Sequence, residues 1–79
     1  MQNQTRLSEA QKGIALTLMR VDALDNRNVL RLCELGLFTG AHVEVLKKSS
    51  AEGSPLLIRV NSIVLCVDEA LAANFWVQS

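Results

Sequence analysis

This 79-residue sequence predicts a mainly β fold: a small, strongly bent barrel of five short strands. Five short segments are rich in apolar and β-branched residues, with loose alternation in residues 14–21 and clean alternation in residues 41–47, which is typical of strands. One short α-helix is expected between the first two strands, and a helical turn before the last one. Five strands on so short a chain cannot enclose a two-sheet core, and closure into a barrel removes exposed strand edges.

The N-terminal residues are polar and lead into a short turn. Residues 1–6 are predicted to be a flexible tail, and residues 7–78 to form a single domain. Residues 7–13 predict a helical turn that Ser8 caps, that Gln11 supports through a return bond, and that a glycine ends.

The first strand and the helix follow. Residues 14–21 predict the strand, because they alternate loosely and include three β-branched side chains. The helix is expected to begin after an Asp25 N-cap and to run to about residue 35. Apolar residues recur there at helical spacing, and Arg31 and Glu34 are expected to pair on the other side. A helix this short is marginal alone, so packing against the sheet must hold it.

Gly36 marks the end of the predicted helix. It stands where a left-handed residue ends a helix, and Leu37 follows as the apolar residue that folds back near Leu32. Thr39 and Gly40 then predict a turn with the glycine at its positive-φ position. The chain is therefore expected to leave the helix and enter the second strand at once.

The second half of the chain is expected to hold the other strands. Within residues 41–47, Val43 and Val45 are predicted to face the core, and His42 and Glu44 the solvent. The remaining elements are a polar loop at 48–55, strands at 56–60 and 63–67 joined by a turn at Asn61 and Ser62, a helical turn at 69–72 capped by Asp68, and a last strand at 74–78.

Charge and composition exclude several functions. Eight basic and eight acidic residues give a formal net charge of zero, and the sequence has no Tyr, so nucleic acid is not an expected partner. No apolar stretch suits a signal peptide or a membrane-spanning helix, which predicts a cytoplasmic protein without membrane insertion. Cys33 and Cys66 are expected to be buried, reduced thiols.

Catalytic and metal-binding patterns are sparse. The single histidine, His42, lies beside no Ser or Cys, and the glycines are scattered, so neither an enzyme nor a bound cofactor is expected. His42 and Glu44 leave the same strand face and are the candidate ligands for a divalent transition metal such as iron. Two ligands are fewer than a tight site needs, so an ordinary solvated strand face is the competing interpretation.

Several side chains are candidates for partner binding. Trp76 is expected to face outward, either as an interface anchor or as a cover for the barrel mouth or the N-terminal turn. Arg27, Arg31, Lys47 and Lys48 either contact an acidic partner surface or form an ordinary solvated face.

The order of these elements, together with Leu35-Gly36-Leu37-x-x-Gly40, resembles the FeoA family of small SH3-like proteins of bacterial ferrous iron uptake. The resemblance extends from residue 7 to 77. The matching segments are Leu7-Ser8, Gly13, residues 31–37, Gly40 with Val43 and Val45, Asn61 and residues 63–65. The sequence departs from the family pattern at Thr39, where Pro is frequent, at Ser62, where Gly is frequent, and at Cys66, where a basic residue is common.

The resemblance implies a five-stranded SH3-like barrel and a non-catalytic accessory protein. Its implied partner is FeoB, a membrane ferrous iron transporter with a cytoplasmic G-protein domain, which would hold the chain peripherally at the inner face of the membrane. The same domain type occurs at the C-terminus of DtxR-like repressors and is linked there to transition metals. The alternative function is therefore a stand-alone metal-binding or metal-responsive regulatory domain, and a homo-oligomer is compatible with either.

Overall fold

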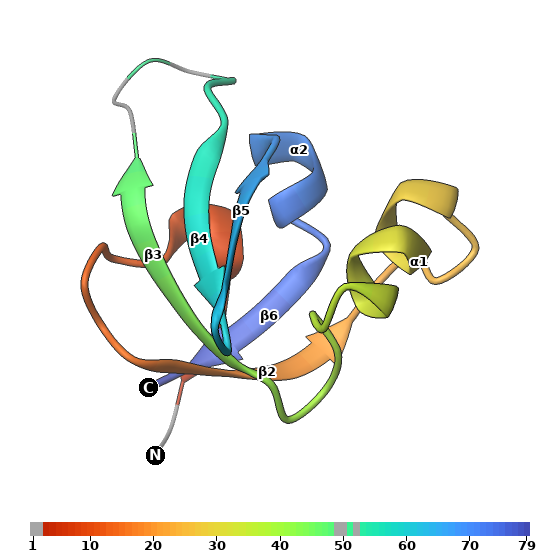
Figure 1. The fold of residues 1–79 in the computed structure, drawn as a ribbon, viewed down its shortest axis with the longest axis horizontal. Coiled ribbons are helices and arrows are strands. Elements are labelled where there is room, and N and C mark those ends of the chain that lie inside the picture. The colour runs from red at the N-terminus through yellow and green to blue at the C-terminus, as the bar shows by residue number, and fades with distance from the viewer. Residues whose placement is uncertain (1–2, 49–50, 52) are drawn as a thin grey trace.

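A bent six-stranded antiparallel sheet forms the body of the molecule in the computed structural model, which describes residues 3–48, 51 and 53–79 (Figure 1). The strand order is β1-β6-β2-β3-β4-β5. The elements are β1 (Thr5–Arg6), the 3-10 turn η1 (Leu7–Glu9), β2 (Leu16–Val21), α1 (Arg27–Glu34), β3 (His42–Lys48), β4 (Leu56–Val60), β5 (Ile63–Val67), α2 (Glu69–Ala72) and β6 (Phe75–Gln78). The predicted mainly β class and the positions of both helices are confirmed, but the described residues contain six strands instead of five.

The additional strand, β1, comes from residues that were predicted to be a flexible tail. Thr5 pairs with Val77 and Arg6 with Trp76 in β6. Arg6 Nη1 also donates a hydrogen bond to the carbonyl oxygen of Ala73 at 2.7 Å. A two-residue strand has no alternation for sequence analysis to detect, because its pairing depends on a strand about 70 residues away.

The turn after β1 forms without the predicted cap. Arg6 occupies the N-cap position with no side-chain cap bond, and Ser8 lies inside η1. Leu7 is fully buried, and the N–H of Ala10 donates to its carbonyl oxygen at 3.2 Å. Packing of Leu7 therefore takes the place of the expected cap, and Gly13, with a φ of 82°, lies beyond the turn instead of ending it.

The N-terminus of α1 lies one residue later than predicted. Asn26, not Asp25, is the N-cap: its Oδ1 accepts from the N–H of Asn28 at 2.8 Å and of Val29 at 3.4 Å. One amide oxygen thus satisfies two of the unpaired donors at the helix start. Adjacent Asp and Asn are both good caps, so the sequence alone does not separate them.

Gly36 stops α1 as predicted, two residues after the last helical residue, Glu34. Gly36 has a φ of 118°, and its N–H donates to the carbonyl oxygen of Cys33 at 3.1 Å. The N–H of Leu37 donates to the carbonyl oxygen of Leu32 at 3.0 Å, which completes a Schellman motif. Leu37 is fully buried as a result. A Cβ on Gly36 would lie 3.6 Å from Val60 Cγ1, so the helix end approaches β4 closely.

The predicted turn at Gly40 then carries the chain into β3. Gly40 has a φ of 94°, and the N–H of Ala41 donates to the carbonyl oxygen of Phe38 at 2.9 Å. The N–H of Gly40 donates to the carbonyl oxygen of Leu18 at 2.7 Å, which ties the turn to β2. This arrangement leaves Phe38 on the surface, with 53% of its area exposed.

The core lies inside the curve of the sheet. Alternate residues of the strands point inward, and Val43 and Val45 are buried as predicted. Asp68 stands at the expected N-cap position of α2, but its side chain makes no cap hydrogen bond. Other fully buried side chains are Leu7, Leu18, Ile58, Val60, Phe75 and Val77. None of the helices in the described residues is both long and apolar enough to span a membrane.

Candidate partner-binding surfaces

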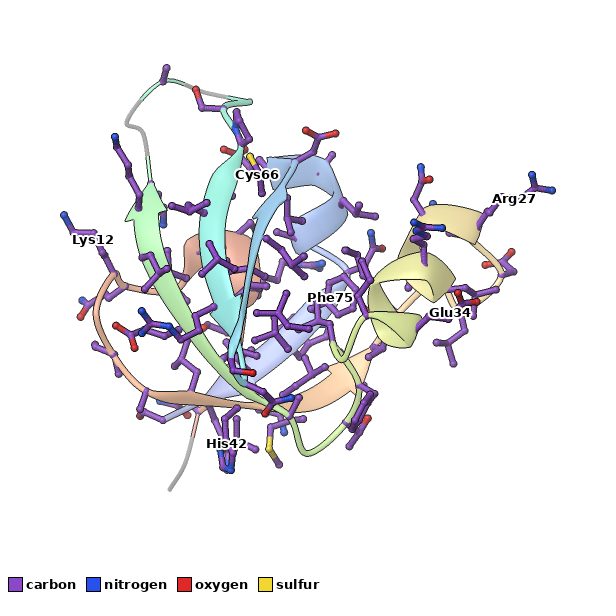
Figure 2. The ribbon with its side chains drawn as sticks, in the orientation of Figure 1. Lys12, Arg27, Glu34, His42, Cys66 and Phe75 are labelled. Carbon is purple, nitrogen blue, oxygen red and sulfur yellow. The ribbon has the colours of Figure 1, made fainter. Side chains whose placement is uncertain are left out.

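The solvent side of α1 and its flanking loops forms an exposed surface of apolar and basic side chains. We call it the helix surface and define it by Leu24, Arg27, Leu30, Arg31 and Phe38. Leu24, Leu30 and Phe38 expose 56%, 44% and 53% of their areas, so three large apolar side chains lie open to solvent. Figure 2 shows Arg27 at this side of the molecule, directed away from the barrel.

Helical spacing explains why this side of α1 is exposed. Val29 and Leu32 are buried against the barrel, which turns Arg27, Leu30 and Arg31 toward solvent. The expected Arg31–Glu34 ion pair is not formed, and within the described residues no carboxylate pairs with Arg27 or Arg31. Both cations of the helix surface are therefore available to another molecule.

Trp76 lies in a different environment, between two arginines on neighbouring strands. The Cζ atoms of Arg6 and Arg20 lie 4.5 and 4.6 Å from the centroid of its ring. The indole Nε1 donates to Asp22 Oδ2 at 2.7 Å, and Arg20 Nε lies 3.4 Å from Asp22 Oδ1. We call Arg6, Trp76, Arg20 and Asp22 the Trp ladder.

Strand register builds the Trp ladder. Arg6 in β1 and Arg20 in β2 are both register partners of Trp76 in β6, so the three side chains line up across the outer face. Trp76 faces outward as predicted, since Phe75 and Val77 are fully buried. Its contacts are cross-strand arginines, however, and not the barrel mouth. Sequence analysis missed Arg6, Arg20 and Asp22 because only the register brings them to the indole.

The basic candidates do not form one patch. Arg27 and Arg31 lie on α1, whereas Lys47 and Lys48 lie at the end of β3, on the opposite side of the view in Figure 1. The contacts of Trp76 include neither Arg27 nor Arg31. The two helix arginines and Trp76 therefore belong to separate surfaces.

The metal-ligand candidates lie together on the outer face of β3. His42 is exposed and Glu44 half-buried, but Glu44 Oε1 lies 3.4 Å from Arg59 Nη1 in an ion pair. Among the described residues, no group of three or more His, Cys, Asp or Glu side chains could hold a metal ion. His42 and Glu44 therefore supply at most two ligands, and the second already has a cationic partner.

The two cysteines are free thiols in different settings. Cys33 is half-buried on α1, and burial raises the pKa of its thiol. Cys66 is exposed, so the expectation of two buried thiols was wrong for this residue. The reason is strand alternation: Leu65 packs against the core and Val67 is buried, which turns Cys66 outward.

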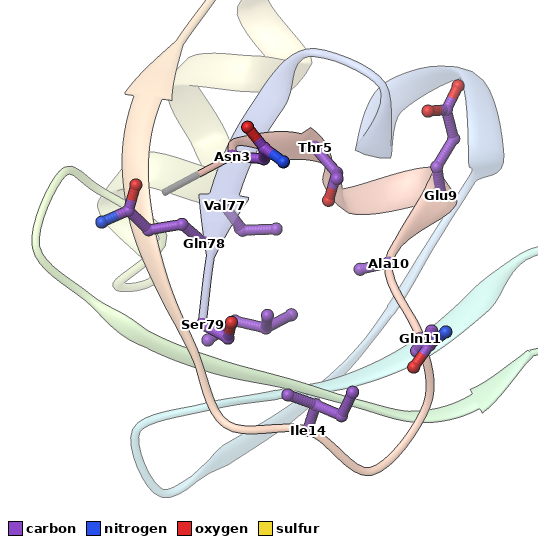
Figure 3. A pocket seen from close by; sticks show the side chains of 10 residues that line it. Asn3, Thr5, Glu9, Ala10, Gln11, Ile14, Val77, Gln78 and Ser79 are labelled. Carbon is purple, nitrogen blue, oxygen red and sulfur yellow. The ribbon is translucent and has the colours of Figure 1, made fainter. Parts of the chain in front are cut away.

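A surface hollow of about 280 Å³ lies beside the two chain ends (Figure 3). Ala10, Ile14 and Val77 contribute apolar lining, and Gln11 a polar side chain. The described residues that line it include one carboxylate side chain, Glu9, and neither His nor Cys. This hollow therefore lacks the paired groups that nucleophilic catalysis or metal binding needs.

The bent six-stranded antiparallel sheet with its two short helices defines a fold class: a small β-barrel domain. The family within that class follows from the sequence. The profile described as the FeoA domain matches residues 5–79. The chain therefore belongs to the FeoA family.

Solved FeoA structures share this fold. A crystal structure of an iron uptake regulatory protein, FeoA, is 25% identical with a TM-score of 0.81, over 96% of this chain and 97% of that one. Stenotrophomonas maltophilia FeoA, crystallised with zinc, is 28% identical with a TM-score of 0.76, over 98% of this chain and 88% of that one. That protein is described as a procaryotic SH3 domain protein and a suggested ferrous iron transport activating factor. The predicted SH3-like fold is thus confirmed.

A repressor shares the fold at lower identity. A manganese-dependent transcriptional repressor is 18% identical with a TM-score of 0.83, and the match covers all of this chain and 43% of the repressor. At this identity the likeness shows the fold alone. No curated protein matches the sequence.

Proposed function

We propose that this chain is a cytoplasmic accessory protein of ferrous iron uptake that binds the cytoplasmic part of a FeoB-like membrane transporter carrying a G-protein domain. Family membership supports a role in iron uptake, and the description of the Stenotrophomonas maltophilia relative supports a role in activating transport. Binding to the transporter would hold the protein at the inner face of the membrane.

The observation that carries this proposal is the helix surface. Leu30 is 44% exposed beside Arg27 and Arg31, whose charges no described carboxylate balances. Covering exposed leucine contributes about 25 cal/mol for each Å² removed from water. Arginine is over-represented in protein interfaces because its guanidinium pairs well with carboxylates. A partner with an acidic, partly apolar surface would satisfy both features, and we assign Arg27 and Arg31 to this contact.

A binding measurement with charge-reversed variants tests the proposal. The isolated cytoplasmic domain of the transporter is titrated with wild-type protein and with the double variant R27E/R31E, using calorimetry for affinity and phosphate release for GTPase rate. The double variant should bind at least about tenfold more weakly, since two charge pairs become two repulsions. The variant K12E is the matched control, because Lys12 is exposed on another part of the surface. Wild-type protein that neither binds nor changes the GTPase rate would refute the proposal.

A second candidate function is that of a metal-responsive domain. The observation that favours it is the zinc complex of the Stenotrophomonas maltophilia relative. His42 and Glu44 would be the ligands contributed by this chain. Titration with ferrous iron, manganese and zinc should then give a dissociation constant tighter than millimolar that His42→Ala abolishes. An unchanged constant in that variant would remove this candidate.

A further inference from the structure

A bulge in β3 sets which side chains share the outer face of the sheet. The register shifts between Val45 and Lys47, so Lys47 becomes the partner of Leu57 in β4. Leu57 is in turn the partner of Cys66 in β5. Because directly paired residues lie on the same face, Lys47, Leu57 and Cys66 form one row across three strands.

This row borders a surface hollow of about 420 Å³. The described residues that line it are Lys47, Lys48, Pro55, Leu57 and Cys66. Leu57 and Pro55 make the hollow apolar, and the exposed Cys66 thiol lies at the β5 side.

The charges at the hollow are unbalanced. Within the described residues, the ammonium group of Lys47 has neither a hydrogen-bond nor an ion-pair partner. Lys48, by contrast, is the register partner of the buried Leu56, and its Nζ donates to the carbonyl oxygen of Ala10 at 3.2 Å, so its ammonium group lies on the other face of the sheet. On the same outer face, by contrast, Arg59 is paired with Glu44. Among the described residues, one ammonium group without a partner, that of Lys47, thus lies beside an apolar surface.

We propose that this hollow binds a small anionic amphiphile: a carboxylate head on a short alkyl chain. The head would lie at the ammonium group of Lys47, and the chain over Leu57 toward Cys66. Recognition of an anionic membrane surface usually takes four to eight basic residues, whereas the described residues at the hollow present one ammonium group, that of Lys47, which favours a small ligand. This site is separate from the helix surface and does not depend on the transporter contact.

Octanoate is the probe for this proposal. Titration of the ¹⁵N-labelled protein should give saturable amide shifts centred on Lys47, Leu57 and Cys66. The variant K47Q should weaken binding about fivefold, the upper end for one exposed charge pair. The variant K12Q should leave it unchanged, because Lys12 is an exposed lysine outside the hollow. Octan-1-ol, which has the same chain without the charge, should bind more weakly than octanoate.

Cys66 provides a second readout that does not depend on chemical shifts. In a Cys33→Ser background, octanoate should slow alkylation of Cys66 by iodoacetamide, and hexanoate, which is two methylenes shorter, should need a concentration about fifteenfold higher, since each buried methylene contributes about fourfold in affinity. Amide shifts spread over the whole molecule, equal binding by K47Q and K12Q, or no protection of Cys66 would each overturn the proposal. Binding to vesicles of anionic lipid without binding to octanoate would also overturn it.

Discussion

The Trp ladder and the helix surface contain similar side chains in opposite states. Each has two arginines and at least one large apolar group at the protein surface. In the ladder, Arg6 and Arg20 lie against the indole of Trp76, and Asp22 accepts a hydrogen bond from the indole N–H. On the helix surface, Arg27 and Arg31 have no carboxylate partner among the described residues.

This difference separates structural side chains from those free to bind. A molecule that engaged the ladder would have to disturb two cation–π contacts, each worth about 0.5–1 kcal/mol at an exposed site, and the bond to Asp22. A molecule that engaged Arg27 and Arg31 would break no such contact. The residue type alone, Trp or Arg, therefore says less about partner binding than whether its contacts are already made.

The largest expected effect concerns Leu37, the buried side chain that anchors the C-terminal end of α1 and so supports the helix surface. Leu37→Ala should lower the free energy of unfolding by about 2–5 kcal/mol, because it leaves a cavity where a fully buried side chain holds the end of α1. Urea unfolding measures the change, and transporter binding should weaken with it. The neighbouring Phe38→Ala, at a 53% exposed side chain, should stay within about 0.5 kcal/mol of wild type. If both variants lost the same unfolding free energy, Leu37 would not be the side chain that anchors the end of α1.

Removal of the helix cap should have the next largest effect. Asn26→Ala should cost about 1 kcal/mol of stability, because the N–H groups of Asn28 and Val29 lose their shared acceptor. Asp25→Ala is the matched control, since that side chain makes no cap bond. Thermal unfolding of both variants measures the difference, and a larger loss in Asp25→Ala would show that the cap is misassigned.

A change within the Trp ladder should affect stability and leave partner binding intact. Trp76→Phe keeps an aromatic ring between Arg6 and Arg20 but deletes the N–H that bonds Asp22, at a cost of about 1 kcal/mol. Denaturant unfolding measures the loss, and calorimetry with the transporter domain should give an unchanged affinity. If Trp76→Phe weakens binding as strongly as R27E/R31E, the distinction between the two surfaces is wrong.

The smallest expected effect is a gain in stability instead of a loss. Arg27 and Arg31 are like charges four residues apart on α1, so Arg27→Gln should raise stability by about 0.2–0.5 kcal/mol while weakening transporter binding. Arg20→Gln is the contrasting variant, because it removes a cation from Asp22 and the indole and should lower stability. Unfolding experiments at low ionic strength measure the change in stability of each variant. A loss of stability in Arg27→Gln would mean that Arg27 has a partner.

Much of the helix surface was outside the reach of sequence analysis. The exposure of Arg27 and Arg31 follows from helical spacing and was expected. Leu24 and Phe38 gave no such signal, because large apolar residues are ordinarily assigned to a core. Their exposure depends on where the loops before and after α1 run, and distant parts of the chain fix those paths.

The sequence by itself determined features whose causes lie within a few residues. Gly36 ends α1 because its φ of 118° suits glycine, and Val43 and Val45 face inward because strands alternate. The tertiary structure decided which distant residues meet. Arg6 and Trp76 are 70 positions apart, and a bulge in β3 places Lys47 beside Leu57. Register and bulges are properties of pairs of strands, so no single segment of the sequence encodes them.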